Sequence, residues 1–293
     1  MKRISIIWLI AGILAVCAVA LTAWRFVLPR TDQRLPAPEV AVQEALDLLD
    51  ADSGMVRRET QDAVRTAAVL VEHGLDTSAE GYYVLAMQYQ REENLGAAES
   101  LYKRAIALRP DWSWPYCGLG NLLGRHCIER TGEAKEALHK AIELDPEWAR
   151  PHNVLAVMLR LENNLEEAEK EALITLKLAP DDVAAHNNYA NLLMALNKYD
   201  EAAKHYKKAI EFSPESAKPY YNLACLYSLQ GREKDAVDNL REALQRSPIL
   251  RADAANDPDL KALRTHAEFR YLVYGEPETP SAANENAAAD SQK

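Results

Sequence analysis

The sequence predicts an all-α solenoid built from stacked helical hairpins, and three observations carry that prediction. Apolar residues follow the i, i+3, i+4, i+7 spacing of one helix face, and the pattern recurs along the chain. Five prolines recur at intervals of 36, 34, 34 and 34 residues: Pro110, Pro146, Pro180, Pro214 and Pro248. Twelve residues before each proline stands an alanine: Ala98, Ala134, Ala168, Ala202 and Ala236. A period of about 34 residues is that of two-helix units that stack on one another.

The repeated alanines indicate where the two helices of each unit cross. A larger side chain there would push the helices apart, because protein interiors are close-packed. A second small slot, five residues before each proline, lies on the same face of the second helix as an apolar slot three residues earlier. These two slots hold Ala105, Ala141, Thr175, Ala209 and Ala243, and Tyr102, Leu138, Ala172, Tyr206 and Leu240.

This order of aromatic, leucine, small and proline slots resembles the tetratricopeptide repeat (TPR) family over residues 79–248, in five repeats. The resemblance implies a right-handed solenoid whose first helices line a concave groove for a protein or peptide. The second repeat departs from the pattern, with two extra residues within 124–132. His152 and His186 replace the first aromatic residue in the third and fourth repeats, and we expect them to fill aromatic space rather than to bind a ligand.

The chain begins with a segment long enough to cross a membrane. Residues 4–24 are uncharged, and 21 helical residues span about 31 Å. We therefore expect residues 1–30 to form a single transmembrane helix that anchors the protein, most naturally in a bacterial inner membrane with the repeats exported. A cleaved signal peptide is the alternative, because Ala18-Val19-Ala20 offers a cleavage site. The charges on the two sides of the segment barely determine its orientation in the membrane. A repeat domain that faces the cytoplasm and a domain secreted after signal cleavage therefore remain alternatives.

The remaining segments complete the predicted stack. Residues 31–39 are expected to form a linker stiffened by proline, and residues 40–78 a degenerate hairpin that covers the first repeat. Residues 249–274 carry apolar residues suited to capping helices. The tail, residues 275–293, is predicted to be disordered because it lacks core residues.

Composition and motifs argue against several functions. A formal net charge of −10 argues against nucleic-acid binding, which needs a basic surface. The segment Gly118–Gly124 approximates a dinucleotide fingerprint, but it lies inside a predicted helix rather than after a strand. Neither a catalytic motif nor a metal-ligand spacing is present, so we expect no enzyme activity, cofactor, metal or small-molecule substrate. Cys117, Cys127 and Cys225 are expected to be free thiols, since an odd three cannot all pair.

The predicted binding site follows from the resemblance, which places the first helices on the concave wall. Positions there that the core does not use are rich in asparagine, aromatic and basic residues: Tyr83, Trp114, Asn121, Arg125, Asn153, Arg160, Asn187, Asn188, Asn191, Tyr221 and Asn222. Side-chain amides both donate and accept hydrogen bonds, so they suit the backbone of an extended peptide. Arg150 and Lys218 should add to a local basic lining, which favours an acidic or carboxylate-bearing partner.

The sequence thus predicts a membrane-tethered TPR scaffold that holds a protein or peptide partner in its groove. The alternative is an accessory subunit of an envelope enzyme system, such as glycan assembly, cytochrome maturation or pilus biogenesis. A self-assembling structural protein is a third possibility, because solenoids have open ends. The apolar segments after Pro248 count against it.

Overall fold

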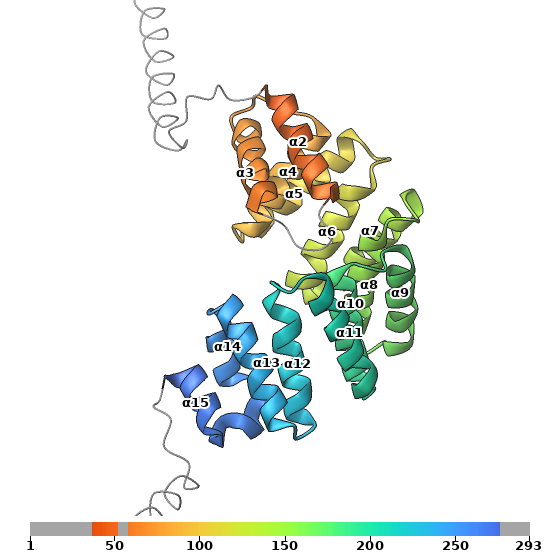
Figure 1. Cartoon of the computed structure of the whole chain (residues 1–293). Helices are drawn as coiled ribbons and strands as arrows, with labels where there is room; N and C mark the ends of the chain where they lie inside the picture. The colour runs from red at the N-terminus through yellow and green to blue at the C-terminus, as the bar shows by residue number, and fades with distance from the viewer. Residues whose placement is uncertain (1–36, 52–57, 276–293) are drawn as a thin grey trace, which may run out of the picture. The chain divides into compact units, whose positions relative to one another are not determined.

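The computed structural model describes residues 37–51 and 58–275, which form helices joined by short turns and contain no strand (Figure 1). The helices below belong to one compact unit, Pro38–Lys293. They are α2 (Pro38–Ala51), α3 (Arg58–Glu72), α4 (Ala79–Arg91), α5 (Leu95–Leu108), α6 (Ser113–His126), η1 (Ile128–Arg130), α7 (Thr131–Leu144), α8 (Ala149–Leu161), α9 (Leu165–Leu178), α10 (Val183–Ala195), α11 (Tyr199–Phe212), α12 (Ala217–Leu229), α13 (Glu233–Arg246), α14 (Leu250–Asn256), η2 (Pro258–Thr265) and α15 (Ala267–Tyr274).

The described helices do not include one that is long and apolar enough to cross a bilayer. The expected anchor, residues 4–24, lies outside the described residues. So do residues 31–36 of the expected linker and residues 276–293 of the expected tail. The structure therefore leaves those three predictions as they stand.

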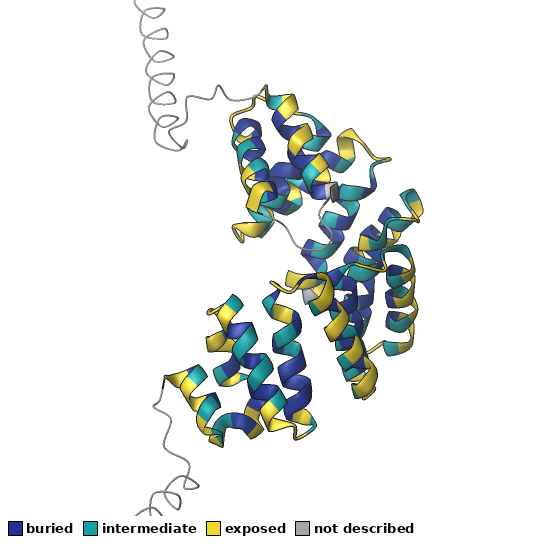
Figure 2. Cartoon of the chain, in the orientation of Figure 1, coloured by how far each residue is buried: buried dark blue, intermediate teal, exposed yellow. Residues whose placement is uncertain are grey.

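Five hairpins, α4–α5, α6–α7, α8–α9, α10–α11 and α12–α13, form the body of the stack. The five repeated alanines are completely buried, at 0% exposure, where the two helices of each hairpin pack. In the neighbouring slots Tyr102, Leu138, Tyr206 and Leu240 are at most 1% exposed. Figure 2 shows the buried residues gathered between paired helices and the exposed ones on their outer sides. The repeated small and apolar slots are thus core positions.

The turns within hairpins follow one pattern in four repeats and a different one in the second. Three-residue turns place their middle residue in the left-handed region: Glu93, Asn163, Asn197 and Gly231, with φ of 61°, 61°, 59° and 72°. In the second repeat the extra residues form η1 instead. Arg130 there donates to Glu99 of α5 at 2.8 and 2.9 Å and to Glu133 of α7 at 2.7 and 2.9 Å. These bonds join the lengthened turn to the second helix of its own hairpin and to α5 of the preceding hairpin.

At the amino-terminal end, α2 and α3 form a hairpin that packs against α4. The first of these helices begins at Pro38, inside the segment predicted to be a linker and two residues before the predicted start at residue 40. Proline suits the first position of a helix, because the amide it lacks has no partner there. The sequence interpretation of Pro38 as a linker stiffener was therefore wrong.

At the other end, α14, η2 and α15 cover the last repeat, and η2 packs on α12. Leu260, Leu263 and Phe269 are 0% exposed in this cap. Asp257 starts η2 by accepting a hydrogen bond from the Asp259 amide at 2.9 Å. Its other carboxylate oxygen accepts from the Tyr221 hydroxyl of α12 at 2.8 Å. One aspartate thus caps η2 and joins it to the last repeat.

Candidate functional site

The first helices of the repeats, α4, α6, α8, α10 and α12, form the inner layer of the stack. Each contacts the next one directly, whereas successive second helices make few contacts or none. Side chains of the inner layer that point away from the core form what we call the inner face. Seven of the predicted site residues lie there half-buried: Trp114, Asn121, Asn153, Asn187, Asn188, Asn191 and Asn222.

Four asparagines of the inner face bond to one another across the repeats, and we call them the asparagine ladder: Asn153, Asn187, Asn188 and Asn222. The Asn188 side-chain amide of α10 donates to the Asn153 carbonyl of α8 at 3.0 Å. The Asn222 amide of α12 donates to the Asn187 carbonyl of α10 at 2.9 Å. Both pairs are separated by 35 residues, so the same contact recurs in successive repeats.

Each asparagine of the ladder still has one polar side-chain atom available to bind a ligand. Nδ2 of Asn153 and Asn187 and Oδ1 of Asn188 and Asn222 have no hydrogen-bond partner among the described residues. All four side chains are half-buried rather than fully covered. The ladder therefore presents two donors and two acceptors on one face.

Arg160, at the end of α8, contributes a cation to the same region. It is half-buried, and its Nε atom is buried without a hydrogen-bond partner in the described part of the chain. Burial lowers the pKa of the Arg160 guanidinium, with the nearby Tyr206 hydroxyl opposing that effect. The Tyr206 hydroxyl itself donates to the Asn191 carbonyl at 2.6 Å. Arg160 thus carries a positive charge that no carboxylate within the described residues is seen to pair.

Two predicted aromatic residues are covered rather than exposed on the inner face. Tyr83 is 3% exposed, because Trp112 and Trp114 pack on its ring at 5.1 and 5.7 Å between centroids. Its burial raises the pKa of the Tyr83 hydroxyl to about 12. Tyr221 is 9% exposed and donates to Asp257 of the cap. Tyr83 and Tyr221 therefore do not lie on the open wall, where the sequence predicted them.

Three tryptophans stack on one another at the starts of α6 and α8, and the sequence prediction included only the middle one. Trp112, Trp114 and Trp148 form this tryptophan stack, with centroids 5.9 and 5.8 Å apart and interplanar angles of 27° and 20°. All three are half-exposed. A sequence signal was present, because Trp112 and Trp148 each stand two residues after a repeat proline and precede a first helix.

The predicted basic residues differ in their solvent exposure. Arg125 in the last turn of α6, Arg150 of α8 and Lys218 of α12 are exposed. They add positive charge at the edge of the inner layer, whereas Arg160 lies within it. The four residues give the inner-layer helices α6, α8 and α12, which contain no acidic residue, a positive charge in a chain of net charge −10.

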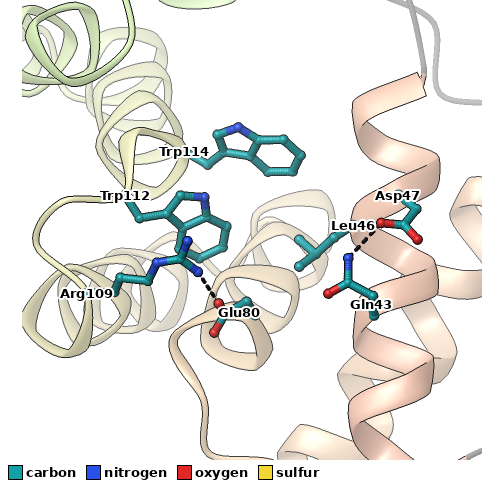
Figure 3. Close-up of a pocket in the computed structure, with 7 residues that line it drawn as sticks. All are labelled: Gln43, Leu46, Asp47, Glu80, Arg109, Trp112 and Trp114. Atoms are coloured by element: carbon teal, nitrogen blue, oxygen red, sulfur yellow. Dashed lines mark hydrogen bonds and ion pairs between the residues drawn. The ribbon is translucent and has the colours of Figure 1, made fainter.

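A pocket opens at the amino-terminal end of the tryptophan stack, with a volume of about 270 Å³ (Figure 3). Its lining comes from α2, α4, the segment that joins α5 to α6, and the first turn of α6: Gln43, Leu46, Asp47, Glu80, Arg109, Trp112 and Trp114. The Arg109 guanidinium pairs with Glu80 and lies 5.1 Å from the centre of the Trp112 ring. The Gln43 amide donates to Asp47 at 2.6 Å.

Two of the three cysteines in the described part of the chain, Cys117 and Cys225, are buried. Cys117, Cys127 and Cys225 are all free. Burial raises the pKa of the Cys117 thiol to about 11 and raises that of Cys225 still further. Cys225, Asp257 and Asp259 offer three metal-ligand atoms within 4.8 Å. However, Asp257 already accepts hydrogen bonds from Tyr221 and from the Asp259 amide, so we interpret this cluster as the latch of the cap.

Stacked helical hairpins with a polar inner face define a repeat protein of the kind that binds other proteins. Comparison with protein families matches residues 79–111 and 217–249 to the tetratricopeptide repeat and residues 190–231 to the TPR repeat. The chain belongs to the TPR family. No curated protein sequence matches it.

Solved structures with the same architecture include three TPR-like chains. PilW, described as a widely conserved type IV pilus biogenesis factor, is 20% identical with a TM-score of 0.56, covering 67% of this chain and 89% of PilW. TTC0263, a thermophilic TPR protein of Thermus thermophilus, is 21% identical with a TM-score of 0.53, covering 65% and 98%. PilF of Pseudomonas aeruginosa is 16% identical with a TM-score of 0.50, covering 72% and 97%. At these identities the likeness is one of fold.

Proposed function

We propose that this chain is a membrane-tethered scaffold that binds an extended, acidic segment of a protein partner on its inner face. The asparagine ladder is the observation that carries the proposal. It leaves two amide donors and two carbonyl acceptors unpaired among the described residues, on one half-buried face. Nothing in the sequence or in the described residues points to catalysis.

An extended peptide is the ligand that such a row of amides fits. Its backbone presents N–H and C=O groups at every residue, with a rise of about 3.3 Å per residue. A side-chain amide can donate to one of these groups and accept from another. Because the ladder amides already bond to each other, their orientation is set before a ligand arrives, which lowers the entropic cost of binding.

The acidic character of the proposed segment follows from Arg160 and its basic neighbours. A half-buried guanidinium without a carboxylate partner gains most from a ligand that supplies one, because charge-assisted hydrogen bonds are the stronger kind. Arg125 and Lys218, which are exposed, would attract the same ligand over a longer range. We therefore expect binding to weaken as salt concentration rises.

The test is capture of the partner from native membranes by full-length protein. The variant carries Asn187→Ala, Asn188→Ala and Asn191→Ala, and capture should fall strongly, since each unpaired peptide group costs about 1–3 kcal/mol. The matched control carries Lys204→Ala, Lys207→Ala and Glu211→Ala on the exposed side of α11 and should capture normally. The ladder also joins repeats, so the helix content and unfolding midpoint of both variants must be measured.

Charge is tested separately with Arg125→Gln and Arg160→Gln together. This variant should capture less partner, and its capture should depend less on salt. A folded asparagine variant that recovers the same proteins in the same amounts as the parent contradicts binding on the inner face. Unchanged salt dependence in the arginine variant would contradict only the acidic character of the bound segment, and not its binding on the inner face.

The membrane tether is proposed from residues 4–24, and we propose export of the repeats from the signal-like start of the chain. Full-length protein should stay with membranes after alkaline carbonate washing, whereas protein beginning at Thr31 should not. A reporter fused after residue 293 reads the orientation, and activity on the cytoplasmic side contradicts export. The fold likeness to PilW and PilF does not select pilus assembly as the pathway.

A further inference from the structure

The pocket at the start of the tryptophan stack has the composition of a subsite for one side chain. Figure 3 shows the indoles of Trp112 and Trp114 on one side and Leu46, Gln43 and Asp47 of α2 on the other. A volume of about 270 Å³ is large enough for a long side chain. The indoles and Leu46 provide apolar walls, and Asp47 provides a carboxylate at the rim.

The charges around the pocket select the sign of its occupant. The positive charge of Arg109 is already balanced within the pocket, because its guanidinium is paired with Glu80 and lies against Trp112. Asp47, by contrast, is exposed and bonded only to the neutral Gln43 amide among the described residues. The pocket lining thus holds two carboxylates and one guanidinium.

The surface next to the pocket carries more negative charge. An adjoining depression on α2 shares Gln43 and Asp47 with the pocket and adds Glu39 and Glu44. Exposed Val40 and half-buried Leu48 line the same depression. An apolar stem followed by a cationic head matches this arrangement, since lysine and arginine bury their stems along apolar surface and keep their charge at the edge.

We propose that this pocket binds an arginine or lysine side chain of the protein partner, with the aliphatic stem against Leu46 and the indoles and the cationic head paired with Asp47. The inference rests on the proposed function, and it adds that the partner carries a basic residue next to the acidic segment. Guanidinium and ammonium groups also interact favourably with indole rings. The partner would then be recognised at two places along the stack: its acidic segment on the inner face and its basic residue in the pocket.

A single-residue probe tests the pocket without requiring the asparagine ladder. Full-length protein labelled with ¹⁵N-tryptophan is titrated with Nα-acetyl-arginine amide and with Nα-acetyl-citrulline amide, its neutral isostere. The indole N–H signals of Trp112 and Trp114 should shift saturably with the arginine probe and at least threefold less with citrulline at equal concentration. A threefold difference corresponds to about 0.65 kcal/mol, which lies within the range for an exposed ion pair. Signals of Trp8 and Trp24 serve as internal references.

The Asp47→Asn variant should bring the arginine response down to the level of citrulline. Asp62→Asn, an exposed aspartate on α3 outside the pocket lining, is the matched control and should leave the difference intact. Equal shifts with both probes, no shift with either, or a stronger response to Nα-acetyl-glutamate amide would each overturn the proposal. The asparagine variants should respond normally here, so failure of the pocket and failure of the ladder are distinguishable.

Discussion

Single residues decide how closely the two helices of each repeat approach. The repeated alanines are fully buried in every copy, so there is no space for a longer side chain at the crossing. The glycines of α6 show the same limit, since a Cβ at Gly120 would lie 2.6 Å from the Leu138 side chain. The residue type at these positions is therefore set by sterics.

The first prediction concerns these crossings. Ala168→Leu and Ala202→Leu should each destabilise the protein by about 1–3 kcal/mol, because overpacking forces neighbouring side chains and backbone to move. Ala107→Leu in α5 places the same side chain at an exposed position and should be nearly neutral. Denaturant unfolding measures all three. Unchanged midpoints in both buried variants would show that the helices do not cross at these alanines.

Both histidines in aromatic slots, His152 and His186, are buried, and His186 forms a pair with His205. His186 is 3% exposed, and one ring nitrogen lies 2.9 Å from the Pro180 carbonyl and the other 2.9 Å from His205. This geometry suits two neutral rings. Burial lowers the pKa of both, that of His205 to about 4, with Lys208 lowering both further and Asp181 and Asp182 raising that of His186.

The second prediction follows from the sign of this shift. Between about pH 6.5 and pH 4 the unfolded chain binds more protons than the folded one, so stability should fall as the pH falls through that window. His205→Gln keeps a donor for His186 and should lose less stability over the same window. His139→Gln, at an exposed position, should behave as the parent. The measurement is the unfolding midpoint at several pH values, and identical pH profiles would contradict it.

Elements at the two ends of the stack differ from the repeats they cover. After the fifth repeat, α14 is only seven residues long, and η2 takes the place against α12. The latch is Asp257, which caps η2 and accepts the Tyr221 hydroxyl. This arrangement covers Tyr221, so the open part of the inner face extends only as far as Asn222 in this repeat.

The third prediction tests the latch. Asp257→Ala removes a helix cap and leaves the buried Tyr221 hydroxyl without its acceptor, and it should cost about 1–3 kcal/mol. Asp253→Ala, exposed on α14, removes the same charge without these bonds and should cost much less. Hydrogen exchange of the amides of η2 and α12 reports the effect locally. Equal exchange rates in the two variants would mean that Asp257 does not hold the cap.

The sequence predicted the core of the repeats because the same residue types recur where the helices pack in all five hairpins. Recurring slots such as Ala98 and Tyr102 reveal the core without reference to any partner. What the sequence could not show were contacts between repeats that involve different slots. The bond from Asn188 to Asn153 joins neighbouring slots of successive repeats, and the burial of Tyr83 depends on two tryptophans from the next repeat. Such pairings depend on how the hairpins stack, which periodicity alone does not define.

At the scale of the whole molecule, the charge of the chain and the charge of the inner-layer helices α6, α8 and α12 have opposite signs. The chain carries a net charge of −10, whereas Arg125, Arg150, Arg160 and Lys218 line the inner layer. The carboxylates of α2 then restore negative charge at the amino-terminal end. A partner segment with acidic and basic residues in a defined order would match both regions, and a neutral one would match neither.

The central claim is that the partner binds the inner face, and site-specific photo-crosslinking in cells tests it most directly. Benzoylphenylalanine is placed at Asn121 or Asn222 on the first helices and, as controls, at Lys204 or Lys234 on the exposed side of the second helices. The account predicts one common crosslinked partner from both inner positions and none from the controls. Crosslinks to that partner from Lys204 or Lys234, with none from Asn121 and Asn222, would contradict it.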